Sequence, residues 1–158
     1  MRKIIYPILL IALISSCKKI STSFDREAFY AMKNKWQNSN ISNYSFKYRN
    51  GGLANFSNTY VIKNNVIVKI IPDTLSHVDT SHRYTISTLF DKIEDLYNQP
   101  YIIKNNSRTY CYYNQINTSY DPQYGFPNSC FCDYECKNIA VTDLGWGFSI
   151  TNFEILNE

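Results

Sequence analysis

The clearest periodic pattern in the chain lies between residues 85 and 99. Apolar residues recur there three and four positions apart, which places them on one face of a helix, with charged residues on the other. Thr85 is suited to cap this helix, and Pro100 ends it. The apolar stripe consists of Ile86, Leu89, Phe90, Ile93, Leu96 and Tyr97.

A second, shorter helical pattern covers residues 24–37. Thr22 or Ser23 is the expected cap, and carboxylates in the first turn suit the helix dipole. Trp36 falls on the apolar stripe of this helix, so we expect it to be a core residue.

The rest of the chain alternates between apolar and polar residues, the period of a half-buried strand. Asn64-Asn65 is a tight hairpin signal, and the stretch 134–145 has no clear pattern. Along the fifth expected strand, Tyr110, Tyr112, Ile116 and Tyr120 share a parity. Strands are expected over 44–48, 56–62, 66–71, 101–104, 108–120, 128–133 and 147–156.

The order of these elements is a helix, three strands, a second helix and three or four strands. Such an order favours an α+β fold, with two helices packed on one face of an antiparallel meander sheet. It also suggests a duplicated unit of one helix and three strands. We expect a single domain over residues 24–158, since this length suffices for one core.

The N-terminus has the organisation of a secretory signal. Arg2 and Lys3 precede an apolar run over 4–14, which is shorter than the roughly 20 residues of a spanning helix. Ile14-Ser15-Ser16-Cys17 then resembles the lipobox of bacterial lipoproteins. A plain cleaved signal and an uncleaved anchor are the competing interpretations. The lipobox predicts a signal peptide over 1–16, a lipid on Cys17, and a tether over 17–23.

Charge gives little indication of a nucleic-acid partner. The chain has 16 basic and 13 acidic residues, and removal of Arg2 and Lys3 with the leader leaves 14 basic residues. No basic cluster follows Lys18-Lys19, so we expect no nucleic-acid binding.

Four cysteines remain after Cys17, an even number that favours disulfides outside the cytoplasm. Antiparallel pairing of Tyr120 with Asn128 across the turn places Cys136 about opposite Tyr112, next to Cys111, so Cys111 and Cys136 are the first candidates for a bridge. That pairing leaves Cys130 and Cys132 on one strand face. Joining Cys111 to Cys130 and Cys132 to Cys136 is the alternative.

Two other chemistries fit the same cysteines. Cys130 and Cys132 suit a redox dithiol, and four thiolates suit zinc. The histidines of the chain, His77 and His82, lie in a polar loop without the spacing of known zinc motifs. We therefore expect structural bridges, no metal and no cofactor.

Several short motifs resemble an uncharacterised family of bacterial lipoproteins that carries a domain of unknown function. They span most of the chain after the leader. The chain departs from that family at Cys130-Phe131-Cys132-Asp133, where the family's strand is apolar before the Asp. The resemblance implies a fold and a location but no catalytic residues. The motifs are Asn43-Tyr44-Ser45-Phe46 after Trp36, Thr85-Ile86 with Leu89-Phe90 and Ile93, Tyr120-Asp121 with Gly125-Phe126-Pro127, and Ile150 with Phe153.

These observations lead to one expected function and two alternatives. The first is a non-enzymatic binding module, anchored by the lipid on Cys17 to the bacterial envelope, at the outer membrane facing the periplasm. No serine-hydrolase, zinc-protease or phosphate-binding motif occurs in the sequence. The partner would be an unknown protein or small molecule. The alternatives are a thiol redox or metal-binding protein that uses Cys111, Cys130, Cys132 and Cys136, and an inhibitor-like module acting on an envelope enzyme.

Overall fold

The computed structural model of the chain describes residues 21–51, 56–73, 83–104, 108–141 and 145–157. Over these residues the chain forms two helices and seven strands. In chain order they are α1 (Arg26–Asn38), β1 (Tyr44–Asn50), β2 (Ser57–Lys63), β3 (Val66–Pro72), α2 (Ile86–Asn98), β4 (Tyr101–Lys104), β5 (Tyr110–Tyr120), β6 (Pro127–Lys137) and β7 (Trp146–Ile155).

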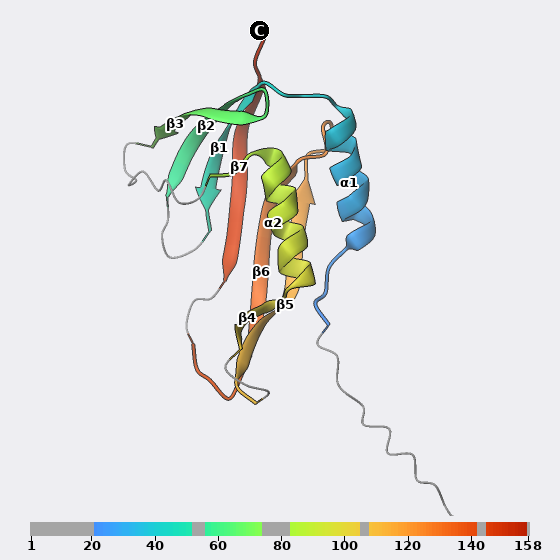
Figure 1. The fold of residues 1–158 in the computed structure, drawn as a ribbon, viewed down its shortest axis with the longest axis vertical. Helices are drawn as coiled ribbons and strands as arrows, with labels where there is room; N and C mark the ends of the chain where they lie inside the picture. The colour runs from blue at the N-terminus through green and yellow to red at the C-terminus, as the bar shows by residue number, and fades with distance from the viewer. Residues whose placement is uncertain (1–20, 52–55, 74–82, 105–107, 142–144, 158) are drawn as a thin grey trace, which may run out of the picture.

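All seven strands belong to one antiparallel sheet in the order β3-β2-β1-β7-β6-β5-β4. Strands β1 to β3 form one meander and β4 to β7 form another. The pairing of β1 with β7 joins the two meanders into a continuous sheet, which Figure 1 shows. The short strand β4 and the strand β3 are therefore its two edges.

The predicted α+β class is wrong. The described chain is a mainly-β, meander-like fold, because one seven-stranded sheet makes most of it and the helices have only 13 residues each. Because helical periodicity is the clearest pattern in the sequence, the predicted fold class assigned the helices a larger part of the fold than they have. The suggested duplicated unit is wrong too, since α1 precedes three strands and α2 precedes four.

Helix α1 begins at Arg26, two residues after the position that the sequence suggested. The carboxylate of Asp25 accepts a hydrogen bond of 3.0 Å from the backbone N–H of Ala28 and so caps the helix. The expected caps, Thr22 and Ser23, instead bond to strand β5. Trp36 is buried, as predicted.

Helix α2 forms as the apolar stripe predicts, and Thr85 caps it. The Thr85 hydroxyl accepts from the backbone N–H of Thr88 at 3.2 Å, and the Thr88 hydroxyl accepts from the Thr85 N–H at 2.8 Å. These two bonds satisfy donors that helix geometry leaves free. The buried residues of the helix are Ile86, Leu89, Phe90, Ile93 and Leu96.

The hairpin between β2 and β3 confirms the turn expected at Asn64-Asn65. Both residues have a positive φ, 50° and 61°, a conformation that asparagine tolerates better than most residues. The turn carries the chain to β3, whose exposed Val66 and Val68 lie along one edge of the sheet.

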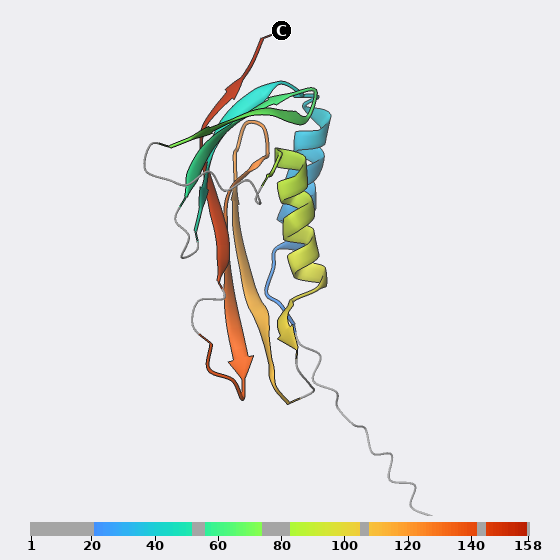
Figure 2. The same cartoon turned by 60° about the vertical axis from the view of Figure 1, so that its left-hand side comes forward.

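A single hydrophobic core joins both helices to one face of the sheet. Figure 2 shows the two helices side by side on the same side of the sheet. The core is rich in aromatic rings; for example, the rings of Phe29 and Phe90 lie 5.7 Å apart between the helices. Its largest fully buried side chains are Tyr44, Tyr48, Tyr60, Phe29, Phe46, Phe90 and Phe148.

The alternation predicted along β5 breaks in the middle of the strand. The sequence placed Tyr110 and Tyr112 on the same face as Ile116. In the structure the register shifts between Tyr113 and Gln115, so Tyr113 and Ile116 both face the core. One extra residue at such a bulge reverses the face on which later residues lie.

None of the helices in the described part of the chain is long and apolar enough to cross a membrane. The apolar run over 4–14, Cys17 and both histidines lie outside the described residues.

Candidate functional site

A short strap, Thr22 and Ser23, precedes α1 and is bonded to the part of β5 that the short strand β4 does not pair with. The Thr22 hydroxyl donates to the carbonyl of Tyr113 at 2.7 Å. The Ser23 N–H donates to the carbonyl of Asn114 at 2.8 Å, and the Ser23 carbonyl accepts from the N–H of Ile116 at 2.9 Å. The sequence had assigned both residues to a tether, but here they are part of the domain.

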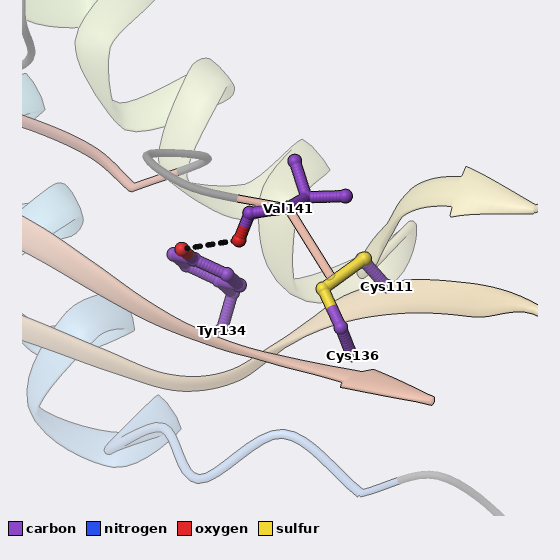
Figure 3. The surroundings of a disulfide bond; sticks show 4 residues. All are labelled: Cys111, Tyr134, Cys136 and Val141. Atoms are coloured by element: carbon purple, nitrogen blue, oxygen red, sulfur yellow. Dashed lines mark hydrogen bonds between the residues drawn. A yellow bond between two sulfur atoms is a disulfide. The ribbon is translucent and has the colours of Figure 1, made fainter. Parts of the chain in front are cut away.

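The disulfide joins Cys111 on β5 to Cys136 on β6, and Figure 3 shows its surroundings. The two residues are direct partners in the antiparallel register, with Cα atoms 4.1 Å apart. Nearby, the Tyr134 hydroxyl donates to the carbonyl of Val141 at 3.3 Å. The first pairing suggested by the sequence is therefore confirmed, and the alternative pairing is not formed.

Cys130 and Cys132 are free thiols, and both are buried in the core. They lie on one face of β6, as the sequence predicts, because a strand turns alternate residues to the same side. The Thr118 hydroxyl donates to the sulfur of Cys130 at 3.6 Å. Cys130 and Cys132 thus form a thiol pair beneath the helices.

The two thiols differ electrostatically. A hydrogen bond from the Cys132 thiol, helped by Thr118, lowers the pKa of Cys130 although burial opposes the shift. The same hydrogen bond, with burial, raises the pKa of Cys132. Burial, with the neighbouring thiols, also raises the pKa of Tyr113 to about 12.

The bridge between two of the cysteines limits the reactions and ligands that the sequence suggested for all four. The disulfide occupies Cys111 and Cys136, so four thiolates are not free to bind zinc. Among the described residues, no three His, Cys, Asp or Glu side chains gather in a way that could hold a metal ion. A redox role now rests on Cys130 and Cys132 alone, and their burial means that an oxidant reaches them only when the core opens.

A surface pocket of about 350 Å³ lies between the second half of α2 and the strands β4 and β5. Its volume is at the lower end of the range for small-ligand sites. The side chains of Lys92, Asp95 and Gln99 give it charge and hydrogen-bonding capacity, and the Lys92 ammonium lies 5.9 Å from the ring centre of Trp146. The pocket is lined by Lys92, Asp95, Leu96, Gln99, Tyr101, Ile102 and Tyr113.

A family model described as a family of unknown function, DUF6174, matches residues 28–155. The chain belongs to DUF6174. No curated protein and no solved structure matches the chain. Membership agrees with the domain of unknown function that the sequence motifs suggested, and it assigns no activity to this DUF6174 chain.

The family match runs from α1 to the last residue of β7. The strap and everything before it precede the match, so the family does not account for the N-terminal signal pattern. Cys17 lies outside the described residues as well.

Sequence reasoning missed several residues of this DUF6174 chain. The sequence predicts a tether at the strap because Thr22 and Ser23 carry no apolar pattern. Thr118 was missed because its contact with Cys130 depends on the β5–β6 register. The pocket residues were missed because the sequence does not show how α2 packs against β4 and β5.

Proposed function

We propose that this chain is a lipid-anchored protein of the bacterial cell envelope that acts as a non-enzymatic binding module. A lipid on Cys17 would hold it at the outer membrane, facing the periplasm. Residues 1–16 have the charged start, the short apolar run and the small residues of a cleaved lipoprotein signal.

The strap is the observation that carries this proposal. Thr22 and Ser23 are bonded to β5, only five and six residues after Cys17. Only four residues, 18–21, thus separate the lipobox cysteine from the first residue that bonds to the sheet. Such an arrangement suits a leader that is removed and a domain that is kept close to its anchor.

Binding rather than catalysis is supported by the character of the pocket beside β4. It is lined by one cation, one carboxylate and one amide together with the apolar side chains of Leu96 and Ile102, which suits recognition of a polar ligand. The cysteines are either bridged or buried, so the surface of the described chain offers no accessible thiol nucleophile.

Lipid attachment is tested by replacing the cysteine of the lipobox. We expect the wild-type chain to incorporate a labelled fatty acid and to sediment with membranes, and Cys17→Ser to lose both properties. Ser21→Ala, which changes a side chain outside the lipobox, is the matched control and should keep both. The intact mass of the mature protein should correspond to a chain that starts at Cys17 and carries acyl groups. A Cys17→Ser protein that still takes up the label would refute the proposal.

A further inference from the structure

Three tyrosines, Tyr101, Tyr110 and Tyr112, gather on the outer side of the β4–β5 pair, where Tyr101 also borders the pocket beside α2; we call this surface the tyrosine face. Tyr101 on β4 is the register partner of Tyr112 on β5. The ring centres of Tyr101 and Tyr110 are 5.9 Å apart, and those of Tyr110 and Tyr112 are 6.0 Å apart. Tyr101 is 42% exposed.

The alternation of buried and half-buried residues along β5 shows which side of the sheet Tyr110 and Tyr112 face. Cys111 and Tyr113, the neighbours of Tyr112 in the chain, are both buried. Successive side chains in a strand point to opposite sides, so Tyr110 and Tyr112 point away from the core. The tyrosine face is thus an outer surface beside the edge strand β4.

The N-terminal segment enters the domain beside this face. Thr22 bonds to the carbonyl of Tyr113, and the N–H of Tyr113 donates to the carbonyl of Pro100 at 2.8 Å. Tyr101 is the next residue along the chain. Both ribbon views show the described residues that precede α1 at the level of β4 (Figures 1 and 2).

The linker from Cys17 to Thr22 comprises five Cα–Cα steps. At about 3.6 Å per residue it spans at most about 18 Å when fully extended. The opposite edge of the sheet, β3, is five strands away from β5, to which Thr22 bonds, or roughly 24 Å at about 4.8 Å per strand. A lipid on Cys17 would therefore hold the β4 edge near the bilayer, while β3 lies beyond the reach of the linker.

We propose that the tyrosine face is seated in the headgroup layer of the membrane to which Cys17 is anchored. The inference rests on the proposed lipid anchor and adds which surface of the domain meets the membrane. Tyrosine suits this layer because its ring is apolar and its hydroxyl is polar, and tyrosines are enriched at membrane–water interfaces.

The groups around the three rings fit the same environment. The Tyr112 hydroxyl donates to the carboxylate of Glu135 at 2.8 Å, so its polar end is satisfied at the surface. Exposed Lys137 is the register partner of Tyr110, and a lysine can extend its ammonium toward lipid phosphates. The opposite charges of Glu135 and Lys137 offset each other, so contact would depend more on the rings than on these two charges.

A photoreactive aromatic residue tests the placement. p-Azidophenylalanine is close to tyrosine in shape, and Tyr101 is exposed, so Tyr101→p-azidophenylalanine should fold; its melting temperature checks this. Exposed Val68 on the far edge strand β3 receives the same residue as a matched control. The lipidated proteins are placed in vesicles of phosphatidylethanolamine and phosphatidylglycerol, irradiated, and analysed by mass spectrometry. We expect phospholipid adducts at position 101 and none above background at position 68.

The outcomes separate the two proposals. A protein without acyl mass that does not sediment with vesicles refutes the anchor itself. A lipidated protein that gives no phospholipid adduct at position 101, or gives as much at position 68, refutes only the placement of the tyrosine face. The same variant can also be irradiated in intact cells. A protein adduct at position 101 in place of a lipid adduct would show that the tyrosine face docks a protein, and it would overturn the inference.

Discussion

Cys111 and Cys136 lie directly opposite each other in the β5–β6 ladder, with Cα atoms 4.1 Å apart. Their bridge joins the start of β5 to the end of β6. The strands at that end carry few buried apolar side chains, since the last residues of β6 alternate between exposed and half-buried. The crosslink therefore stabilises an end of the sheet where the side chains of β6 are poorly buried.

Reduction of this bridge should destabilise the domain. The cysteines are 25 residues apart, and closing a loop of that size contributes about 3–4 kcal/mol in the chain-entropy model. Dithiothreitol should lower the melting temperature of the wild-type protein. The double variant Cys111→Ala/Cys136→Ala should melt at a similarly lowered temperature with or without reductant. An unchanged wild-type melting temperature on complete reduction of the bridge would contradict the prediction.

Phe90 anchors α2 in the core and should be the costliest residue of that helix to truncate. Its side chain is 1% exposed and its ring contacts those of Phe29 and Tyr120. Phe90→Ala should lower the free energy of unfolding by about 3–5 kcal/mol. Exposed Ser87→Ala on the same helix is the control and should change it by less than about 0.5 kcal/mol. Equal urea midpoints for the two variants would mean that Phe90 is not buried.

The capping pair of α2 makes a smaller contribution that can be measured separately. Thr85→Ala removes a hydroxyl that accepts from the N–H of Thr88 and should cost about 1 kcal/mol. Thr85→Ser keeps the oxygen and should retain most of the stability. Urea unfolding of both variants checks the prediction, and equal losses would show that the hydroxyl is not the cause.

Glu94 should make the domain more stable at neutral pH than in acid. Hydrogen bonds from Lys33 at 2.7 Å and from the Tyr30 hydroxyl at 2.8 Å lower the pKa of Glu94 below its ordinary value of 4.5. A lowered pKa in the folded state contributes stability above the unfolded pKa, and that contribution is lost as the pH falls through the folded pKa.

Glu94→Gln should therefore reduce the urea midpoint at pH 7, and the gap to wild type should shrink as the pH falls below about 4.5. Exposed Glu154→Gln on β7 is the control for a general loss of negative charge. A gap for Glu94→Gln that stays constant from pH 7 to pH 3 would show that ionisation of Glu94 is not its source.

Local patterns predicted the features that depend on local geometry. The stripe of α2 and its threonine cap follow from helical spacing and hydrogen bonding within four residues. The Asn64-Asn65 turn follows from the tolerance of asparagine for positive φ. These features form because nearby residues favour them, so the sequence is sufficient to predict them.

Features set by distant parts of the chain were missed. Strand β6 continues to Lys137 because β5 and the disulfide hold it, although residues 134–137 show no apolar alternation. The bulge after Tyr113 coincides with the site where the strap bonds to β5. No local pattern encodes either contact. The predicted fold class was wrong for the same reason. The share of the chain that belongs to one sheet depends on pairing between strands that are far apart in sequence.

The disulfide was partly predictable, because it depends both on a local turn and on the pairing of two strands. Its pairing was predicted because the turn near Tyr120 sets the register of β5 against β6, and the number of residues on each side then brings Cys136 to Cys111. The prediction was one residue off, with Cys136 placed opposite Tyr112, because the bulge was not foreseen. No such counting of residues applies to the strap, to Thr118 or to the pocket, so no pattern in the sequence indicates them.

The last prediction concerns the remaining thiols, Cys130 and Cys132, which are 0% and 5% exposed. Alkylation needs an accessible thiolate, so reaction should wait for the core to open, although hydrogen bonds lower the pKa of Cys130. In native buffer without reductant, iodoacetamide should modify neither residue over a time in which a peptide thiol reacts completely. In denaturant both should react, and peptide mapping should locate the label at these two positions. Phe90→Ala, which loosens the core above β6, should react faster than Ser87→Ala. Rapid native labelling of either cysteine in the wild-type protein would contradict their burial and restore a redox role for the pair.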